Sequence, residues 1–208
     1  MIAVKTKKEL RKELRFRRRI IEPAESEAAA EAAASLFTAQ QDWQQLHHIA
    51  VYLAADGELD CAPLVRRART AQKTLYLPNV EDGQLLFVPW EPEAALEIGR
   101  YGIATVRGSA VAPQVLDAVI SPLVGFSRFG FRLGMGGGFY DRFFESAPKS
   151  LLRIGWAFEA QHEDALEHCR EATDQDLNKV VTEVAVHSFV DKLGGEAAKP
   201  NQPGRERV

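Results

Sequence analysis

The sequence is poor in the residues that metal centres, disulfide scaffolds and membrane spans require. Only two of its 208 residues are cysteines and five are histidines. Cys61 and Cys169 stand far apart, and no second ligand accompanies them at zinc-binding spacing. No apolar run approaches the roughly 20 residues that cross a bilayer, and the first residues are basic rather than apolar. These absences argue against zinc chemistry, a disulfide scaffold and a membrane partner, and they predict a cytoplasmic protein.

Positive charge is concentrated at the start of the chain. The formal net charge is −3, yet Met1–Arg19 holds nine Lys or Arg against two Glu. Leucines at helical spacing and cations on another face predict an amphipathic helix over Lys7–Ile21. Lys7 and Arg11 are four residues apart and therefore share a face, where both can bind one anionic group.

Two other interpretations of this basic helix stay open. Charge runs are often solvated faces, and nine cations attract any polyanion, nucleic acid included. The rest of the chain is acidic and carries no nucleic-acid fold signature. We therefore expect no nucleic-acid partner, favour the phosphates of a nucleotide as the ligand of Lys7 and Arg11, and expect Arg17, Arg18 and Arg19 to be mostly solvated.

The rest of the chain alternates between helical and strand-like segments. Further helices are predicted over Ala24–Gln40, Ala62–Gln72, Glu93–Ile98 and Phe139–Phe144. Strands are predicted over His48–Ala54, Thr74–Leu77, Leu85–Val88, Ala118–Val124, Arg153–Phe158 and Val180–Val186. This alternation predicts one three-layer α/β domain over residues 1–193, with a mostly parallel sheet and helices on both faces. Residues 194–208 are rich in Gly, Pro and charge, which predicts a disordered tail.

Glycine gathers in one stretch. Six of the fifteen glycines fall between Gly125 and Gly138, after an apolar strand and before a helix start. Backbone N–H groups and the helix dipole at such a place can bind phosphate oxygens. The spacing completes neither a Gly-x-Gly-x-x-Gly pattern nor a P-loop, and a flexible connection is the plain alternative. The flanking Arg132, Tyr140 and Asp141 add a cation, an aromatic face and a metal ligand, which favours nucleotide chemistry.

The string Arg132-Leu-Gly-Met-Gly-Gly-Gly-Phe-Tyr-Asp141 resembles the signature of the 5-formyltetrahydrofolate cyclo-ligase family. Lys7 and Arg11 resemble the family's N-terminal Lys-x-x-x-Arg, Val51–Asp60 resembles its strand-and-turn motif, and Val180–Glu183 resembles its C-terminal strand. The resemblance implies an ATP- and Mg²⁺-dependent enzyme, expected to be a monomer, that closes 5-formyltetrahydrofolate to 5,10-methenyltetrahydrofolate. In the implied reaction the formyl oxygen attacks the γ-phosphate of ATP, and N10 then attacks the resulting iminium phosphate.

The resemblance also implies roles for individual residues. ATP contacts are implied for Lys7, Arg11, Arg132, Gly134, Met135, Gly136, Gly137, Gly138 and Tyr140. Folate contacts are implied for Leu53, Glu58, Tyr101, Phe139 and Tyr140. Mg²⁺ is expected on Asp141 and on the neutral amide oxygen of Asn178, and Arg132 and Asp141 are expected to act in catalysis.

The glutamate of the Asp-Gly-Glu turn has its own rationale. Glu58 follows a strand, and open α/β sheets usually bind ligands at the carboxyl ends of their strands. A carboxylate there can accept two N–H donors of a reduced pterin, while a solvated turn glutamate is the plain alternative. Two functions from other classes also stay open, because fold alone does not decide activity. These are a folate- or nucleotide-binding module without turnover and a sugar-phosphate isomerase-like enzyme.

Overall fold

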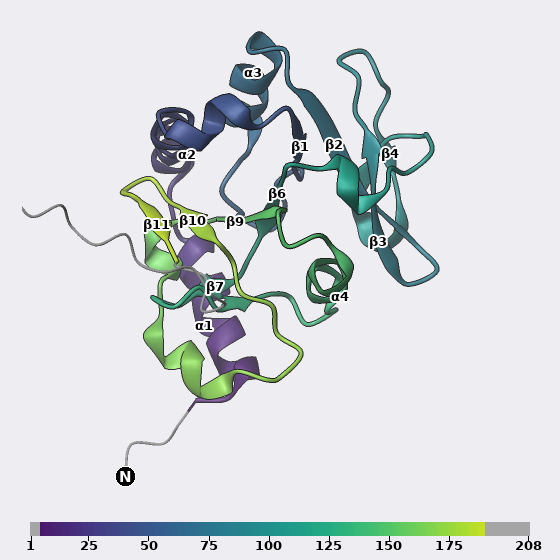
Figure 1. The fold of residues 1–208 in the computed structure, drawn as a ribbon. Helices are drawn as coiled ribbons and strands as arrows, with labels where there is room; N and C mark the ends of the chain where they lie inside the picture. The colour runs from purple at the N-terminus through teal and green to yellow at the C-terminus, as the bar shows by residue number, and fades with distance from the viewer. Residues whose placement is uncertain (1–4, 190–208) are drawn as a thin grey trace, which may run out of the picture.

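The computed structural model describes residues 5–189, apart from the side chain of Tyr101. Its centre is a seven-stranded sheet with the order β11-β10-β9-β6-β1-β2-β3 (Figure 1). The strands are β1 (His48–Ala50), β2 (Thr74–Glu81), β3 (Gln84–Pro89), β6 (Ala118–Pro122), β9 (Leu152–Trp156), β10 (Lys179–Val181) and β11 (Val186–Ser188). The five inner strands pair in parallel, and β3 and β11 pair antiparallel at the two edges. The predicted α/β fold with a mostly parallel sheet is confirmed.

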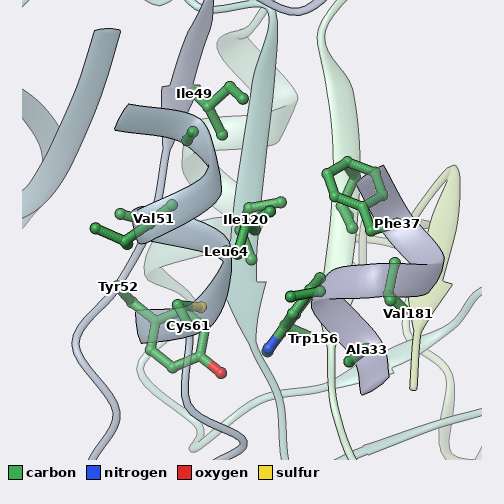
Figure 2. Packing of buried hydrophobic residues seen from close by; sticks show 14 of the residues in the cluster. Ala33, Phe37, Ile49, Val51, Tyr52, Cys61, Leu64, Ile120, Trp156 and Val181 are labelled. Atoms are coloured by element: carbon green, nitrogen blue, oxygen red, sulfur yellow. The ribbon is translucent and has the colours of Figure 1, made fainter. Parts of the chain in front are cut away.

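Helices cover both faces of this sheet and the carboxyl ends of its parallel strands. They are α1 (Lys7–Arg19), α2 (Pro23–Thr38), α3 (Ala62–Thr70) and α4 (Phe139–Ser146). On one face, α2 and α3 bury Phe37 and Leu64 against Ile120 and Trp156 of the sheet (Figure 2). On the other face, α4 buries Phe143 and Phe144, and Phe143 meets Phe87 of β3 edge to face, with ring centroids 4.9 Å apart. Burying each large apolar side chain contributes about 1.5 to 3 kcal/mol, so these contacts fix both helical layers.

The sequence of α2 explains its close fit to the sheet. Pro23 occupies the first turn, where its missing N–H costs nothing. The alanine-rich stretch that follows favours the helix and lets its backbone approach the strands closely, because alanine side chains are small. Four of these alanines are buried, at positions Ala29, Ala30, Ala33 and Ala34.

The basic helix α1 lies across the carboxyl ends of the parallel strands. A capping box between Thr6 and Glu9 starts it. Its buried Leu10 and Leu14 pack against Val124, which follows β6, and against the short hairpin of β7 (Gly125–Phe126) and β8 (Arg132–Leu133). Helix α1 is therefore held where open α/β sheets usually bind their ligands.

The structure corrects two predicted elements. Glu93–Ile98 is not helical: Glu97–Ile98 forms β4, which pairs with β5 (Ala104–Thr105). A six-residue segment gains too few hydrogen bonds to offset helix nucleation, so pairing prevails. The predicted strand Val180–Val186 is two strands, β10 and β11, because the Thr182 hydroxyl accepts the backbone N–H of Ala185 and closes a turn between them.

The remaining elements are short 3₁₀ helices. These are η1 (Gln41–Gln45), η2 (Arg100–Gly102), η3 (Pro113–Val115), η4 (Glu159–Gln161) and η5 (Asp164–Cys169). Within residues 5–189 no helix is long and apolar enough to span a membrane. Cys61 and Cys169 are both free thiols. The predicted tail over residues 194–208 lies outside the described residues.

Candidate active site

The glycine loop joins β8 to α4 and leaves the start of that helix without a side-chain cap. Gly136 and Gly138 have φ values of 102° and 64°, in the left-handed region that favours glycine. Gly138 is the N-cap residue of α4, and glycine has no side chain that could cap the helix. The first N–H groups of α4 and the positive end of its dipole therefore suit a bound anion. The loop is open to solvent at Met135, Gly136 and Gly137, and Met135 is 55% exposed.

Arg132 is buried at the base of this loop. It is only 4% exposed, and its Nη2 donates to Asp141 Oδ1 at 2.7 Å. Its guanidinium lies 5.4 Å from the ring centroid of Tyr140 and 5.8 Å from that of Phe144. The Nε atom is also buried and has no hydrogen-bond partner among residues 5–189. Because an unsatisfied buried donor is costly, this N–H is a ready contact for a ligand oxygen.

Two cations of α1 reach the same place. Arg11 Nε donates to the backbone oxygen of Gly134 at 2.8 Å. A Cβ placed on Gly136 would lie 3.6 Å from the Arg11 guanidinium, in ordinary van der Waals contact, so this cation lies against the loop. One turn earlier, Lys7 Nζ lies 3.0 Å from Asp174 Oδ2. Arg11 of the predicted face therefore contacts the glycine loop, while Lys7 contacts Asp174 and Glu171.

Asp141 and Asp174 are brought together from distant parts of the sequence. The backbone N–H of Gln175, the residue after Asp174, donates to Asp141 Oδ1 at 3.3 Å. Each carboxylate also has a cation beside it, Arg132 for Asp141 and Lys7 for Asp174. Within residues 5–189, no group of three or more His, Cys, Asp or Glu side chains forms a metal-binding cluster. This part of the site therefore offers two aspartates on segments that meet at the Gln175 backbone.

Glu58 lies in the turn after β1. Its side chain is 14% exposed, and its Oε2 accepts the backbone N–H of Ala55 at 3.1 Å. Burial raises the pKa of this carboxyl group, while that N–H and the charge of Arg18 act in the opposite direction. The predicted solvated alternative for Glu58 is therefore wrong. A carboxylate that is mostly removed from water and has one backbone donor can accept further donors from a ligand.

Tyr140 links the two parts of the site. Burial raises the pKa of its hydroxyl group, the Arg132 charge lowers it, and the Glu58 charge raises it. Glu58 of the turn and Arg132 of the loop thus both act on one phenol. The ring of Tyr140 also lies 5.9 Å from that of Phe144, which fixes it against the sheet.

The remaining predicted residues are placed less centrally. Leu53 is half-buried and packs against the core cluster under α2 and α3. Phe139 is half-buried at the start of α4, with the Arg142 guanidinium 5.1 Å from its ring centroid. Tyr101 belongs to η2, and its side chain is not described. Asn178 Oδ1 accepts the backbone N–H of Arg153 at 2.8 Å, so this oxygen holds β10 in register with β9.

Sequence reasoning missed one residue and misplaced one cation. Asp174 was not singled out, although it begins an acidic run, Asp174-Gln-Asp176, just before the final parallel strand. Arg18 was expected to be mostly solvated, and this is wrong, because it is only 2% exposed. The signal was present: Arg18 follows Leu10 and Leu14 at a spacing of four, which puts it on the buried face of α1.

These features define an α/β protein with an open glycine loop, two aspartates on neighbouring segments and a mostly buried glutamate at the carboxyl ends of its strands. The 5-formyltetrahydrofolate cyclo-ligase family model matches residues 3–183, and the chain belongs to this family.

Similar proteins agree with this assignment. The 5-formyltetrahydrofolate cyclo-ligase of Escherichia coli K12 is 36% identical over 155 residues, which cover 71% of this chain and 85% of that protein. The NMR structure of Aquifex aeolicus 5,10-methenyltetrahydrofolate synthetase superimposes with a TM-score of 0.78 at 29% identity, covering 94% of this chain and 99% of that one. A synthetase of the same name from Mycoplasma pneumoniae shares the fold, with a TM-score of 0.71 at 22% identity over 85% and 98% of the two chains.

Proposed function

We propose that this chain catalyses the ATP- and Mg²⁺-dependent closure of 5-formyltetrahydrofolate to 5,10-methenyltetrahydrofolate, with release of ADP and phosphate. The observation that carries the proposal is the convergence of α1, the glycine loop and the Asp141–Asp174 pair on one site, with Glu58 in the neighbouring turn. Membership of the cyclo-ligase family supports the choice of substrate, and the names of the relatives support the product.

The nucleotide is proposed to bind with its phosphates over the glycine loop. The uncapped N–H groups at the start of α4 and the unpartnered Nε of Arg132 are donors that phosphate oxygens can use. Lys7 and Arg11 add charge from α1, at Asp174 and at the Gly134 carbonyl respectively. Phosphoryl transfer requires mainly positioning and charge neutralisation, and this half of the site provides both without a protein nucleophile.

The carboxylate pair fits Mg²⁺. Magnesium in nucleotide sites usually takes one or two carboxylates, with phosphate oxygens and water completing its shell. Asp141 and Asp174 both lie at the Gln175 backbone, and each now pairs with a cation that phosphate could attract instead. When bound, the ion would neutralise charge on the phosphates. Asn178 stays a prediction as a ligand, but its oxygen already joins two strands, so we propose Asp174 as the second ligand.

The folate half is proposed to be organised around Glu58. A reduced pterin presents neighbouring N–H donors, and a carboxylate accepts two of them at once. The Glu58 side chain is mostly buried, so it forms these bonds without competition from much water. The charges of Glu58 and Arg132 both act on the hydroxyl group of Tyr140. We therefore propose that its aromatic ring lies between the folate and nucleotide halves.

The reaction then needs the two substrates held in line. The formyl oxygen attacks the γ-phosphorus, the bond to the bridging oxygen breaks, and ADP leaves. The N10 lone pair attacks the activated carbon, N10 loses its proton, and phosphate departs as the methenyl bridge forms. Within this sequence, Arg132 and Lys7 neutralise phosphate charge, the loop amides hold the phosphates, and Glu58 orients the pterin.

One assay tests substrate, cosubstrate and metal together. The protein is mixed with 5-formyltetrahydrofolate, ATP and Mg²⁺, and the near-ultraviolet absorbance of the methenyl product is followed while ADP is measured. Product and ADP should form in equal amounts, and omitting ATP or Mg²⁺ should abolish both. Folate binding without product would indicate a binding module instead, and product formation without ATP would contradict the proposed chemistry.

A further inference from the structure

Arg18 is a charged residue on the buried face of α1. It follows Leu10 and Leu14 at helical spacing, and its side chain is fully removed from solvent. Taking a guanidinium out of water costs several kcal/mol unless the surrounding structure pairs it with acceptors. The position therefore requires partners, and the partners indicate what the residue does.

Each arm of the guanidinium contacts one of two neighbouring segments. Nε donates to the Asp56 backbone oxygen at 3.0 Å, and Nη2 donates to Asp56 Oδ2 at 2.9 Å. Nη1 donates to the Leu123 backbone oxygen at 3.0 Å. Asp56 belongs to the turn after β1, and Leu123 directly follows β6. Arg18 thus joins α1 to the carboxyl ends of two adjacent parallel strands.

The turn that Arg18 holds is strained and carries Glu58. Asp56 and Gly57 both have positive φ, 53° and 72°, a conformation that a non-glycine residue adopts only when its surroundings impose it. The Arg18 bonds to Asp56 supply such a constraint, with Arg15 Nε donating to the same Asp56 oxygen at 2.9 Å. Arg18 Nη2 also lies 3.7 Å from Glu58 Oε1, close enough for a direct charge interaction.

We infer that Arg18 is a positioning residue for folate binding: it fixes the 55–58 turn and so presents the Glu58 carboxylate as a hydrogen-bond acceptor to the pterin. The inference rests on the proposed role of Glu58 in holding the pterin. It assigns to α1 a second task, distinct from the proposed binding of phosphate by Lys7 and Arg11. One helix would then align the two substrates, with its start at the nucleotide and its end at the folate.

The electrostatics around Glu58 give this inference a pH signature. Burial raises the pKa of Glu58, and the positive charge of Arg18 opposes that rise. In the same turn, the Asp56 carboxylate pairs with Arg15, Arg18 and Arg19. The remaining titratable groups near Glu58 are Tyr52 and Cys61 beside the turn and Tyr140 of α4, and burial raises the pKa of each. These groups stay neutral around pH 7, so Arg18 is the cation opposing protonation of Glu58 there. Removing Arg18 should therefore shift the acid limb of the pH profile of folate kcat/KM, where the activity falls as the pH is lowered, to higher pH.

Three variants test the inference with the full chain. Arg18→Met removes the charge and the three guanidinium hydrogen bonds, and Arg18→Lys keeps the charge only. Arg17→Met is the matched control. Arg17 is the neighbouring arginine, and it pairs with Glu13 and Glu163. Folate and ATP Michaelis constants are measured between pH 5.5 and 8.5, with a thermal melt of each protein.

For Arg18→Met we expect the folate Michaelis constant to rise about tenfold or more at pH 7, equivalent to about 1.4 kcal/mol. The acid limb of folate kcat/KM should shift to higher pH, while the ATP constant stays within about threefold. Arg18→Lys should keep the acid limb in place with a raised folate constant, because a lysine cannot form all three bonds. Arg17→Met should overlay the wild type.

Two outcomes would overturn the inference. One is a folded Arg18→Met protein whose folate constant and acid limb match the wild type. The other is an equal rise in the folate and ATP constants, which would mean general loosening of the fold. If Arg18→Met does not fold, Arg18→Lys decides alone: an unchanged folate constant, or equal losses for both substrates, removes the positioning role. Failure of the proposed function is a separate result, since it would appear as absent product in the wild-type assay.

Discussion

The proposed nucleotide and folate halves of the site achieve their charge balance in different ways. In the nucleotide half, opposite charges pair with each other: Arg132 with Asp141, and Lys7 with Asp174. In the folate half, the Glu58 carboxylate is mostly buried and accepts one backbone N–H, that of Ala55. Its nearest cation is Arg18, whose Nη2 lies 3.7 Å from Glu58 Oε1. A ligand of the first half exchanges partners with existing ion pairs. A ligand of the second half supplies donors that a desolvated carboxylate lacks.

This difference predicts how each half responds to substitution. Loss of one member of an ion pair leaves the other uncompensated and changes both metal and phosphate binding. Loss of the charge at Glu58 removes contacts to the ligand but also relieves a desolvation cost in the free protein. Substitutions in the nucleotide half should therefore reduce turnover most, while a substitution at Glu58 should separate binding from stability.

The largest effect is expected at Asp141. Asp141→Asn keeps the shape but removes the charge that we propose for Mg²⁺, so turnover should fall by at least about a hundredfold, a barrier increase of roughly 2.7 kcal/mol. High Mg²⁺ should restore part of the activity. The measurement is activity against Mg²⁺ concentration with a thermal melt, and Glu145→Gln, an exposed acid on the same helix, is the control. A variant that melts normally with a wild-type Mg²⁺ curve would reduce Asp141 to a partner of Arg132.

The same Mg²⁺ titration separates Asp174 from Asn178. Asp174→Asn should raise the Mg²⁺ concentration needed for half-maximal rate, because the second carboxylate of the pair loses its charge. Asn178→Ala should instead lower the melting temperature, because it leaves the Arg153 N–H without its acceptor. The reverse pattern, with a metal defect in Asn178→Ala alone, would restore the assignment based on sequence.

A smaller effect is expected for the two cations of α1. Lys7→Ala and Arg11→Ala should each raise the ATP Michaelis constant about tenfold or more, since a charge-assisted contact contributes about 1.5 to 3 kcal/mol. The folate constant should change little, because both side chains lie at the glycine loop or Asp174. Lys12→Ala, an exposed cation of the same helix, is the control for net charge. Wild-type ATP dependence in both variants would make this face merely solvated.

The comparison also shows which parts of the molecule were predictable. The parallel sheet and α1 follow from periodicity and composition, and the glycine loop is a local pattern. The second carboxylate was missed because Asp174 and Asp141 meet only through the backbone of Gln175, a contact between segments far apart in sequence. Arg18 was missed for a different reason: cation runs are usually solvated, and only the packing of Leu10 and Leu14 turns this arginine inward.

In the folate half, Glu58→Gln should raise the folate Michaelis constant by up to about tenfold and leave the ATP constant nearly unchanged. The amide oxygen can accept hydrogen bonds, but its NH₂ group cannot accept the second pterin donor, so about one bond to a charged group is lost. Separate binding titrations for the two ligands give the answer. Equal losses for ATP and folate, or none, would remove Glu58 from the pterin site.

The smallest effect is expected on the stability of the same variant. Burial raises the pKa of Glu58 above its usual value, so between the unfolded and folded pKa values the folded state holds more protons than the unfolded state. Stability therefore falls as the pH rises through that window, and the ionised carboxylate disfavours folding at neutral pH. Glu58→Gln removes this penalty, so in the absence of ligands the variant should melt at a slightly higher temperature than wild type at pH 7. The difference should shrink as the pH falls and disappear below about pH 4, where the carboxyl group is protonated in both states.

Thermal melts of the variant and the wild type from pH 4 to 8 measure this difference. A variant that melts lower at pH 7 would show that the bond to Ala55 and the charge of Arg18 outweigh burial. Glu58 would then stabilise its half of the site just as the ion pairs stabilise the other.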